Sequence, residues 1–411
     1  MSRTQIAVRG ALALGALWAL VSCDNNTNAD IISPRPVNAI FQSYVAIGNS
    51  ITAGFQSDGI NDSTQKQSYA LLLARSMGTR YAYPSLAMPG CAPPISNFLT
   101  QARLTLAGQP ASTAATCALR SPASVTAALN NVAVPGYGSA DPNVQVAPHQ
   151  NPLGELFLGG KSMAQRALDV HPTFATVWIG NNDILSPAIQ GLSPFATAQP
   201  TSQAAFVTNY AGMIKTLLDG APGVKGVLIG VVQIASAPVM VNSQALLNPA
   251  FAAGINQATG KTVLIDPTTC VPGNTSLIGF PLIAQIKAGV LPPIIACAKT
   301  ATPPVGDLFV LDAAKQVQAK AIVDGYNAYI KAKADSIGFA YYDPNTTLAR
   351  LATLDPILAS HVPNIGSATA PFGQYVTLDG IHPSGAAQIQ IANDLVAVIN
   401  AKFGTTLQPA G

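Results

Sequence analysis

Hydrophobic runs alternate with amphipathic helical repeats along most of the chain. The β-branched run at residues 226–234 is typical of a buried strand in a parallel sheet. We predict five strands, at residues 44–48, 81–86, 175–180, 226–234 and 339–342. Apolar residues spaced three or four apart predict helices at 68–77, 203–218, 312–336 and 384–401. This alternation indicates a parallel sheet with helices on both faces, in which a site is expected at the carboxyl ends of the strands.

Two long stretches, residues 91–160 and 236–305, do not fit the alternation. Each carries two cysteines, and sequence proximity favours the pairs Cys91–Cys117 and Cys270–Cys297, although four cysteines allow three pairings. Long connections are usually functional caps or linkers, and disordered linkers seldom carry cysteine pairs. We therefore expect two ordered, disulfide-bearing insertions. A metal site is the alternative, but Cys-x-x-Cys is absent and no histidine adjoins these cysteines, so we predict none.

The first 22 residues have the pattern of an export signal. Arg3 and Arg9 precede an apolar stretch at 11–21 that is too short to span a bilayer. The sequence Leu20-Val21-Ser22-Cys23 resembles the lipobox of bacterial lipoproteins, which implies lipidation of Cys23; the alternative is an ordinary secretory signal. The polar residues after Cys23 predict a flexible tether over 23–40.

We therefore expect a protein exported and lipid-anchored to the bacterial cell envelope, at the outer membrane or the periplasmic face. No other uninterrupted apolar run approaches the roughly 20 residues of a membrane span, so we predict no transmembrane helix. Charged residues make up 9% of the chain, the formal net charge is +3, and no run of Lys or Arg is present. This composition argues against a nucleic-acid partner and suits an enzyme that works outside the cytoplasm.

Two motifs near opposite ends of the chain carry candidate chemistry. Ser50 follows the strand predicted at 44–48, and Asp379 and His382 lie three residues apart near the C-terminus. A serine hydroxyl becomes nucleophilic when a base accepts its proton, and a carboxylate fixes the tautomer of an imidazole base. Because these motifs have to meet in space, we expect one domain over 41–405.

Two further segments supply hydrogen-bond donors for acyl-transfer chemistry. Gly90 and Asn182 each follow a predicted strand. Acyl transfer builds negative charge on the carbonyl oxygen, and preorganised donors stabilise it. Glycine lets its backbone N–H approach a substrate closely, and an asparagine amide is a good second donor.

The order of these motifs resembles that of the SGNH hydrolases, also called the GDSL family of esterases and lipases. The Gly-Asp-Ser motif of the family corresponds to Gly48-Asn49-Ser50, its lone glycine to Gly90, its Gly-x-Asn-Asp motif to residues 180–183, and its Asp-x-x-His motif to residues 379–382. The resemblance implies a three-layer α/β/α fold of the flavodoxin-like type, with a parallel sheet of about five strands.

The resemblance also implies roles for individual residues. Ser50 is expected as the nucleophile, His382 as the base and Asp379 as the residue that orients it. The backbone N–H groups of Ser50 and Gly90 and the side chain of Asn182 are expected to form the oxyanion hole. One position departs from the family: residue 49 is Asn instead of the usual Asp, which affects local hydrogen bonding rather than nucleophile or base.

These observations predict a serine hydrolase that cleaves carboxylic esters, an esterase or lipase, without metal or cofactor. Its expected partners are a small ester or lipid substrate and the membrane reached through the lipid anchor. We also expect the 236–305 insertion to wall an acyl pocket. Two alternatives remain open: an acyltransferase or deacetylase acting on a cell-surface glycan, and a non-catalytic surface lipoprotein with a disabled hydrolase fold.

Overall fold

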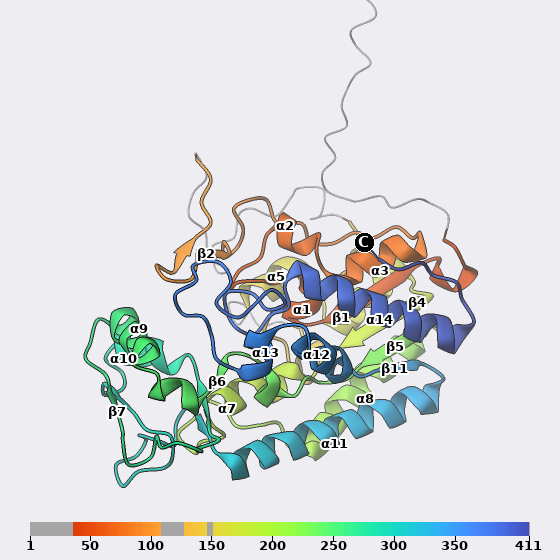
Figure 1. The fold of residues 1–411 in the computed structure, drawn as a ribbon. Helices are drawn as coiled ribbons and strands as arrows, with labels where there is room; N and C mark the ends of the chain where they lie inside the picture. The colour runs from red at the N-terminus through yellow and green to blue at the C-terminus, as the bar shows by residue number, and fades with distance from the viewer. Residues whose placement is uncertain (1–35, 108–126, 146–150, 411) are drawn as a thin grey trace, which may run out of the picture.

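The structure is a computed structural model of the 411-residue chain and describes residues 36–107, 127–145 and 151–410. A parallel sheet of four strands lies at its centre (Figure 1). The strands are β1 (Tyr44–Gly48), β4 (Phe174–Trp178), β5 (Lys225–Ile229) and β11 (Ala340–Tyr342), in the order β1-β4-β5-β11. All three strand pairings are parallel, as the alternation of strands and helices predicted.

Side chains alternate between the two faces of this sheet. In β1, Val45 and Ile47 belong to one hydrophobic core, whereas Tyr44 and Ala46 belong to another on the opposite face. This follows from the two-residue period of a strand. Both faces are apolar, so helices have to cover both.

Helices pack on each face and give the three-layer α/β/α arrangement. One face is covered by α3 (Tyr69–Met77) and α14 (Gly385–Phe403), which contact each other. The other is covered by α6 (Met163–Ala167), α8 (Gln203–Gly220) and α11 (Ala313–Ile337). The helices expected at 68–77, 203–218, 312–336 and 384–401 are therefore present, with ends within two residues of the prediction.

Shorter elements connect this framework. The remaining α-helices are α1 (Ser50–Ala53), α2 (Asp62–Gln65), α5 (Pro152–Leu158), α7 (Leu185–Ile189), α9 (Pro249–Thr259), α10 (Leu282–Lys287), α12 (Pro344–Ala352) and α13 (Pro356–Ser360). The 3-10 helices are η1 (Ala39–Phe41), η2 (Asp141–Asn143), η3 (Leu168–Val170), η4 (Asn181–Asp183), η5 (Ile234–Ser236) and η6 (Ser243–Leu247). The remaining strands are β2 (Ile95–Asn97), β3 (Ala102–Arg103), β6 (Met240–Asn242), β7 (Leu264–Ile265), β8 (Leu277–Gly279), β9 (Ile294–Ile295) and β10 (Val310–Leu311).

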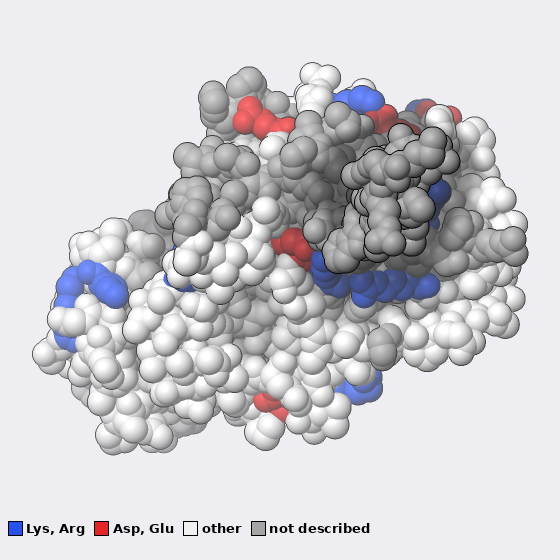
Figure 2. All heavy atoms as spheres, turned by 90° about the horizontal axis from the view of Figure 1, so that it is seen from above, with Lys and Arg blue, Asp and Glu red and all other residues white. Residues whose placement is uncertain are grey.

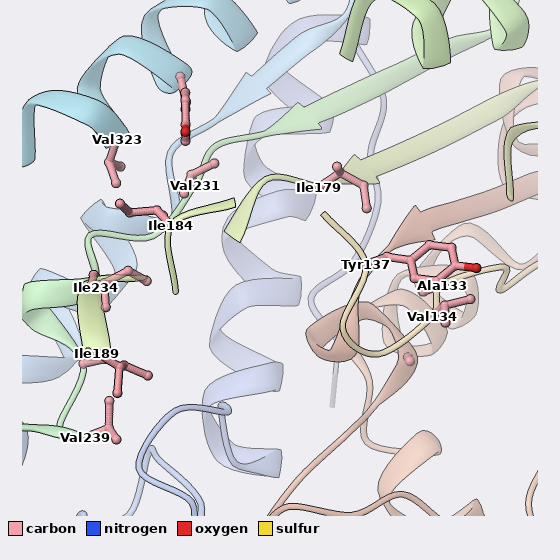
Figure 3. Packing of buried hydrophobic residues seen from close by; sticks show 14 of the residues in the cluster. Ala133, Val134, Tyr137, Ile179, Ile184, Ile189, Val231, Ile234, Val239 and Val323 are labelled. Carbon is pink, nitrogen blue, oxygen red and sulfur yellow. The ribbon is translucent and has the colours of Figure 1, made fainter. Parts of the chain in front are cut away.

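An irregular segment at residues 130–134 occupies the free edge of β1. Its backbone exchanges hydrogen bonds with Ala46, and Val134 N–H donates to the carbonyl of Gly48 at 3.1 Å. Ala133, Val134 and Tyr137 pack in the same core as Ile179, just beyond β4 (Figure 3). The sheet therefore has four regular strands and one irregular edge segment, where about five strands were expected.

Two predicted strands differ from the structure. Residues 81–86 form no strand, because the backbone of Ala82 pairs with Asn130 and Asn131, and Leu86 N–H donates to the side chain of Gln65. The strand predicted at 226–234 ends at Ile229. Beyond it, asparagine side chains instead of a neighbouring strand accept the N–H groups of Val231 and Val232.

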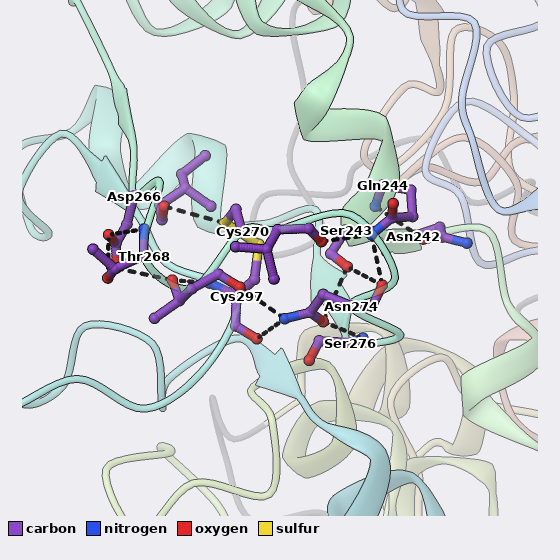
Figure 4. The surroundings of a disulfide bond; sticks show 12 residues. Asn242, Ser243, Gln244, Asp266, Thr268, Cys270, Asn274, Ser276 and Cys297 are labelled. Carbon is purple, nitrogen blue, oxygen red and sulfur yellow. Dashed lines mark hydrogen bonds between the residues drawn. A yellow bond between two sulfur atoms is a disulfide. The ribbon is translucent and has the colours of Figure 1, made fainter.

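Residues 240–311 form a lobe outside the three layers. It contains the antiparallel sheet β10-β8-β6, the pair β7-β9, and helices α9 and α10 (Figure 1). The predicted disulfide Cys270–Cys297 is present, and Asn274 donates to the backbone carbonyls of Thr269 and Cys297 beside it (Figure 4). Cys91 is buried, but Cys117 lies outside the described residues, so their pairing stays a prediction.

Charged side chains are sparse on the face drawn in Figure 2, in keeping with the composition. Within the part of the chain that the structure describes, no helix is long and apolar enough to cross a membrane. The predicted signal, Cys23 and most of the predicted tether lie outside that part.

Candidate active site

Ser50 lies at the first position of α1, directly after the turn that follows β1. The side chain of Asn49 caps this helix, because its Oδ1 accepts the N–H of Ile51 at 3.3 Å. Its Nδ2 is buried and has no hydrogen-bond partner among the described residues. An aspartate provides the same capping oxygen, so Asn49 preserves the cap that an Asp at this position would make.

The structure brings the two ends of the chain together at Ser50. His382 Nε2 lies 2.8 Å from Ser50 Oγ, although 332 residues separate the two in the sequence. On the other side of the ring, His382 Nδ1 lies 2.8 Å from Asp379 Oδ2. The three side chains thus form one continuous chain of hydrogen bonds, with the serine hydroxyl at one end and the carboxylate at the other.

The carboxylate of Asp379 is held by several donors besides His382. Its Oδ1 accepts the N–H groups of Ile381 and His382, both at 2.9 Å, and Oδ2 accepts the N–H of Asp58 at 2.9 Å. Burial raises the pKa of this carboxyl, but the electrostatic interaction with His382 and these hydrogen bonds outweigh it. The pKa of Asp379 therefore lies well below its usual value, and the group stays ionised at neutral pH.

Two side chains that the sequence analysis missed fix the histidine. The ring of Phe55 packs against the ring of His382, with centroids 5.0 Å apart. Gln388, fully buried in α14, accepts the N–H of Tyr69 at 2.9 Å and donates to the carbonyl of Ile51 at 3.2 Å. Because α14 begins just after His382, this glutamine ties the histidine loop to the helix that carries Ser50.

Gly90 lies in a loop that packs against residues 60–61. Its φ of +118° is a conformation that favours glycine, and a Cβ there would lie 2.3 Å from the carbonyl oxygen of Ile60. The loop is anchored on both sides: Cys91 N–H donates to Ile60 O at 2.9 Å, and Asn61 Nδ2 donates to Pro89 O at 3.1 Å. These contacts hold the loop in place, which the backbone N–H of Gly90 would need in order to act as a fixed hydrogen-bond donor.

Asn182 lies in η4, in the turn that follows β4. The register pairs Gly48 with Trp178, so this turn and the turn that carries Ser50 start at the same edge of the sheet. Asn182 Nδ2 donates to the carbonyl of Tyr137 at 2.8 Å. An amide nitrogen carries two hydrogens, and this bond uses one of them.

The last residue of the Gly-x-Asn-Asp motif, Asp183, is a buried carboxylate whose role the sequence did not reveal. Asp183 accepts the N–H of Ser139 at 2.7 Å and its hydroxyl at 2.6 Å. Burial raises the pKa of Asp183, while the hydrogen bonds from Ser139 act in the opposite direction. Because Tyr137 and Ser139 belong to the same loop, Asp183 holds in place the backbone that orients the amide of Asn182.

Comparison with known proteins decides the family. The sequence profile of the GDSL-like lipase/acylhydrolase family matches residues 44–395, which is most of the chain and includes every candidate site residue from Ser50 to His382. The chain belongs to this family. No curated protein matches the sequence.

The GDSL-like chain is also similar to solved structures. An extracellular lipase from Streptomyces rimosus has 13% identity and a TM-score of 0.32; the match covers 87% of this chain and 99% of that one. The periplasmic domain of a lipopolysaccharide acetyltransferase from Salmonella ser. Paratyphi A has 11% identity and a TM-score of 0.29, covering 67% of this chain and 72% of that one.

The family is one of lipases and acylhydrolases, so the protein is a hydrolase of the GDSL-like type. The described residues contain no group of three or more His, Cys, Asp or Glu side chains placed to hold a metal ion. The described residues do place a serine hydroxyl, a histidine and an ionised carboxylate so that two consecutive hydrogen bonds join them.

Proposed function

We propose that the protein is a serine esterase or lipase that works through an acyl-enzyme on Ser50. The observation that carries this proposal is the pair of 2.8 Å contacts that join Ser50 Oγ, His382 and Asp379. Asp379 accepts from Nδ1–H, which leaves Nε2 as the acceptor for the serine proton. This arrangement is the one that general-base activation of a serine requires.

The reaction proceeds in two halves. Ser50 Oγ attacks the ester carbonyl carbon while His382 Nε2 takes its proton, and the tetrahedral intermediate collapses as the C–O bond to the alcohol breaks. His382 returns the proton to the leaving alcohol. Water then attacks the acyl-enzyme, giving a proton to His382, and the acid leaves as Ser50 Oγ is protonated again. Asp379 stays ionised and stabilises the imidazolium in both halves.

The negative charge on the carbonyl oxygen needs donors that are already in place. We assign this role to the N–H groups of Ser50 and Gly90 and to the second amide hydrogen of Asn182. In support, the loop of Gly90 is anchored to Ile60 and Asn61, and the amide of Asn182 is oriented by the carbonyl of Tyr137.

We further propose that the mature protein is anchored to the cell envelope by lipid on Cys23. The support is the sequence alone: a basic start, a short apolar stretch and Leu20-Val21-Ser22-Cys23. An acyl chain on Cys23 and a polar tether would hold the enzyme at a membrane surface, close to lipid-soluble esters.

Replacing members of the triad tests the mechanism. We expect Ser50→Ala and His382→Ala to lower kcat for an aryl acetate by about a million-fold, and Asp379→Asn by about ten-thousand-fold, because histidine retains some basicity without its carboxylate. Matched controls are Ser336→Ala and His171→Ala, at exposed positions, which should leave kcat unchanged. Full activity in Ser50→Ala would refute the assignment, and a folded wild-type protein inactive on all esters would favour a non-catalytic lipoprotein.

Replacing Asn182 tests the oxyanion role. We expect Asn182→Ala to lower kcat by about 100- to 1000-fold with little change in KM, as for loss of one donor to the transition state. Asn143→Ala is the matched control, because Asn143 Nδ2 also donates to a backbone carbonyl at 2.8 Å, that of Asn209, and is exposed. A raised KM with kcat retained would show that Asn182 binds the ground state instead.

Replacing Cys23 tests the anchor. We expect Cys23→Ser to move the protein from the membrane fraction to a soluble or unprocessed form, because a polar tether has no affinity for lipid of its own. The measurement is fractionation with mass spectrometry of the mature N-terminus. An unmodified N-terminus at another residue of the wild-type protein would contradict the proposal.

A further inference from the structure

An apolar pocket lies directly beside the triad. It sits at the carboxyl ends of β4 and β5, between the histidine loop and helices α12, α13 and α14, which lie together beside α1 in Figure 1. The empty volume is about 580 Å³. This space includes the mouth of the pocket, which is open to solvent.

The lining connects this pocket to the catalytic residues. Ile51 follows Ser50 in the chain, and Ile381 and Pro383 stand on either side of His382; all three line the pocket. Part of the pocket wall is therefore built from residues that adjoin Ser50 and His382 in the chain.

The chemistry of the lining selects the occupant. No lining residue carries a charge, and the walls include Leu348 of α12, Leu358 of α13 and Ile391 of α14. The hydroxyl of Thr347, one of the few polar groups, is already engaged by Tyr342 and Asp394. Trp178 and Tyr375 are the other lining residues with a polar side-chain atom. A charged headgroup would lose its hydrogen bonds with water here and find no opposite charge, whereas an alkyl chain gains from leaving water.

We infer that this pocket binds an unbranched aliphatic chain of the ester substrate, and that it makes the protein selective for medium or long chains. The inference rests on the proposed function. It also relocates the pocket expected from the sequence: of the 236–305 segment, Ala237 and Pro238 contribute to this lining, and the remainder comes from other parts of the chain.

The test narrows the pocket and measures chain-length selectivity. Leu348→Trp places a larger side chain in the wall, and Leu354→Trp is the matched control, because Leu354 is 58% exposed just after α12. Two substrate series separate the two ends of an ester: aryl esters from acetyl to decanoyl, and acetates of alcohols from ethyl to decyl. Leu348→Phe is a milder change at the same position. Thermal unfolding of every variant shows whether a changed chain-length preference comes from the pocket or from a loss of fold.

Each methylene that enters the pocket is worth about fourfold in kcat/KM. If Leu348→Trp excludes two or three methylenes, the ratio of kcat/KM for the eight-carbon substrate to that for the two-carbon substrate should fall roughly 15- to 60-fold in one series. A fall in the acyl series identifies the occupant as the acyl chain, and a fall in the alcohol series identifies it as the alkoxy chain. Unchanged ratios in both series, in a folded variant, would overturn the inference.

A binding measurement keeps this test separate from catalysis. Decanoate should bind to the Ser50→Ala protein, and adding Leu348→Trp should weaken its Kd at least about tenfold, whereas Leu354→Trp should not change it. If the wild-type protein hydrolysed none of the esters while decanoate binding still depended on Leu348, the proposed function would be refuted and the pocket assignment would stand. If hydrolysis depended on Ser50 but Leu348→Trp left the Kd for decanoate unchanged, only the pocket assignment would be refuted.

Discussion

The parallel pairing of β1 with β4 is the constraint on which the rest of the site depends. Its register places Gly48 opposite Trp178, so the turns that carry Ser50 and Asn182 begin at one edge of the sheet. A shift by one residue would turn every side chain of β1 to the opposite core and displace the serine with it. The alternating cores on the two faces hold this register.

The histidine reaches this edge from the other end of the chain, and buried polar contacts fix its approach. Gln388 bonds α14 to both α1 and α3, and the donors around Asp379 lock the loop that bears His382. An unpaired buried amide or carboxylate would be costly, so these contacts specify one arrangement of the loop. The residues that hold the loop in place are thus different from those proposed to act in catalysis.

The sequence was sufficient to predict the strand at 44–48, the four long helices, the Cys270–Cys297 bridge and the residues that meet at Ser50. It was not sufficient to predict features in which a side chain, instead of a neighbouring strand or helix, forms the hydrogen bond to a backbone group. The edge segment at 130–134 is short and pairs through Asn130, whose amide donates to the carbonyl of Tyr44. Asp183 and Gln388 likewise act through partners 44 or more residues away, which no local pattern reveals.

The most direct test of the central claim, that His382 activates Ser50, is labelling with a fluorophosphonate followed by peptide mapping. The account predicts one adduct per chain, on Ser50, forming at a rate that falls steeply in His382→Ala while the fold is retained. An adduct on another residue, or equally fast labelling of Ser50 without His382, would contradict it.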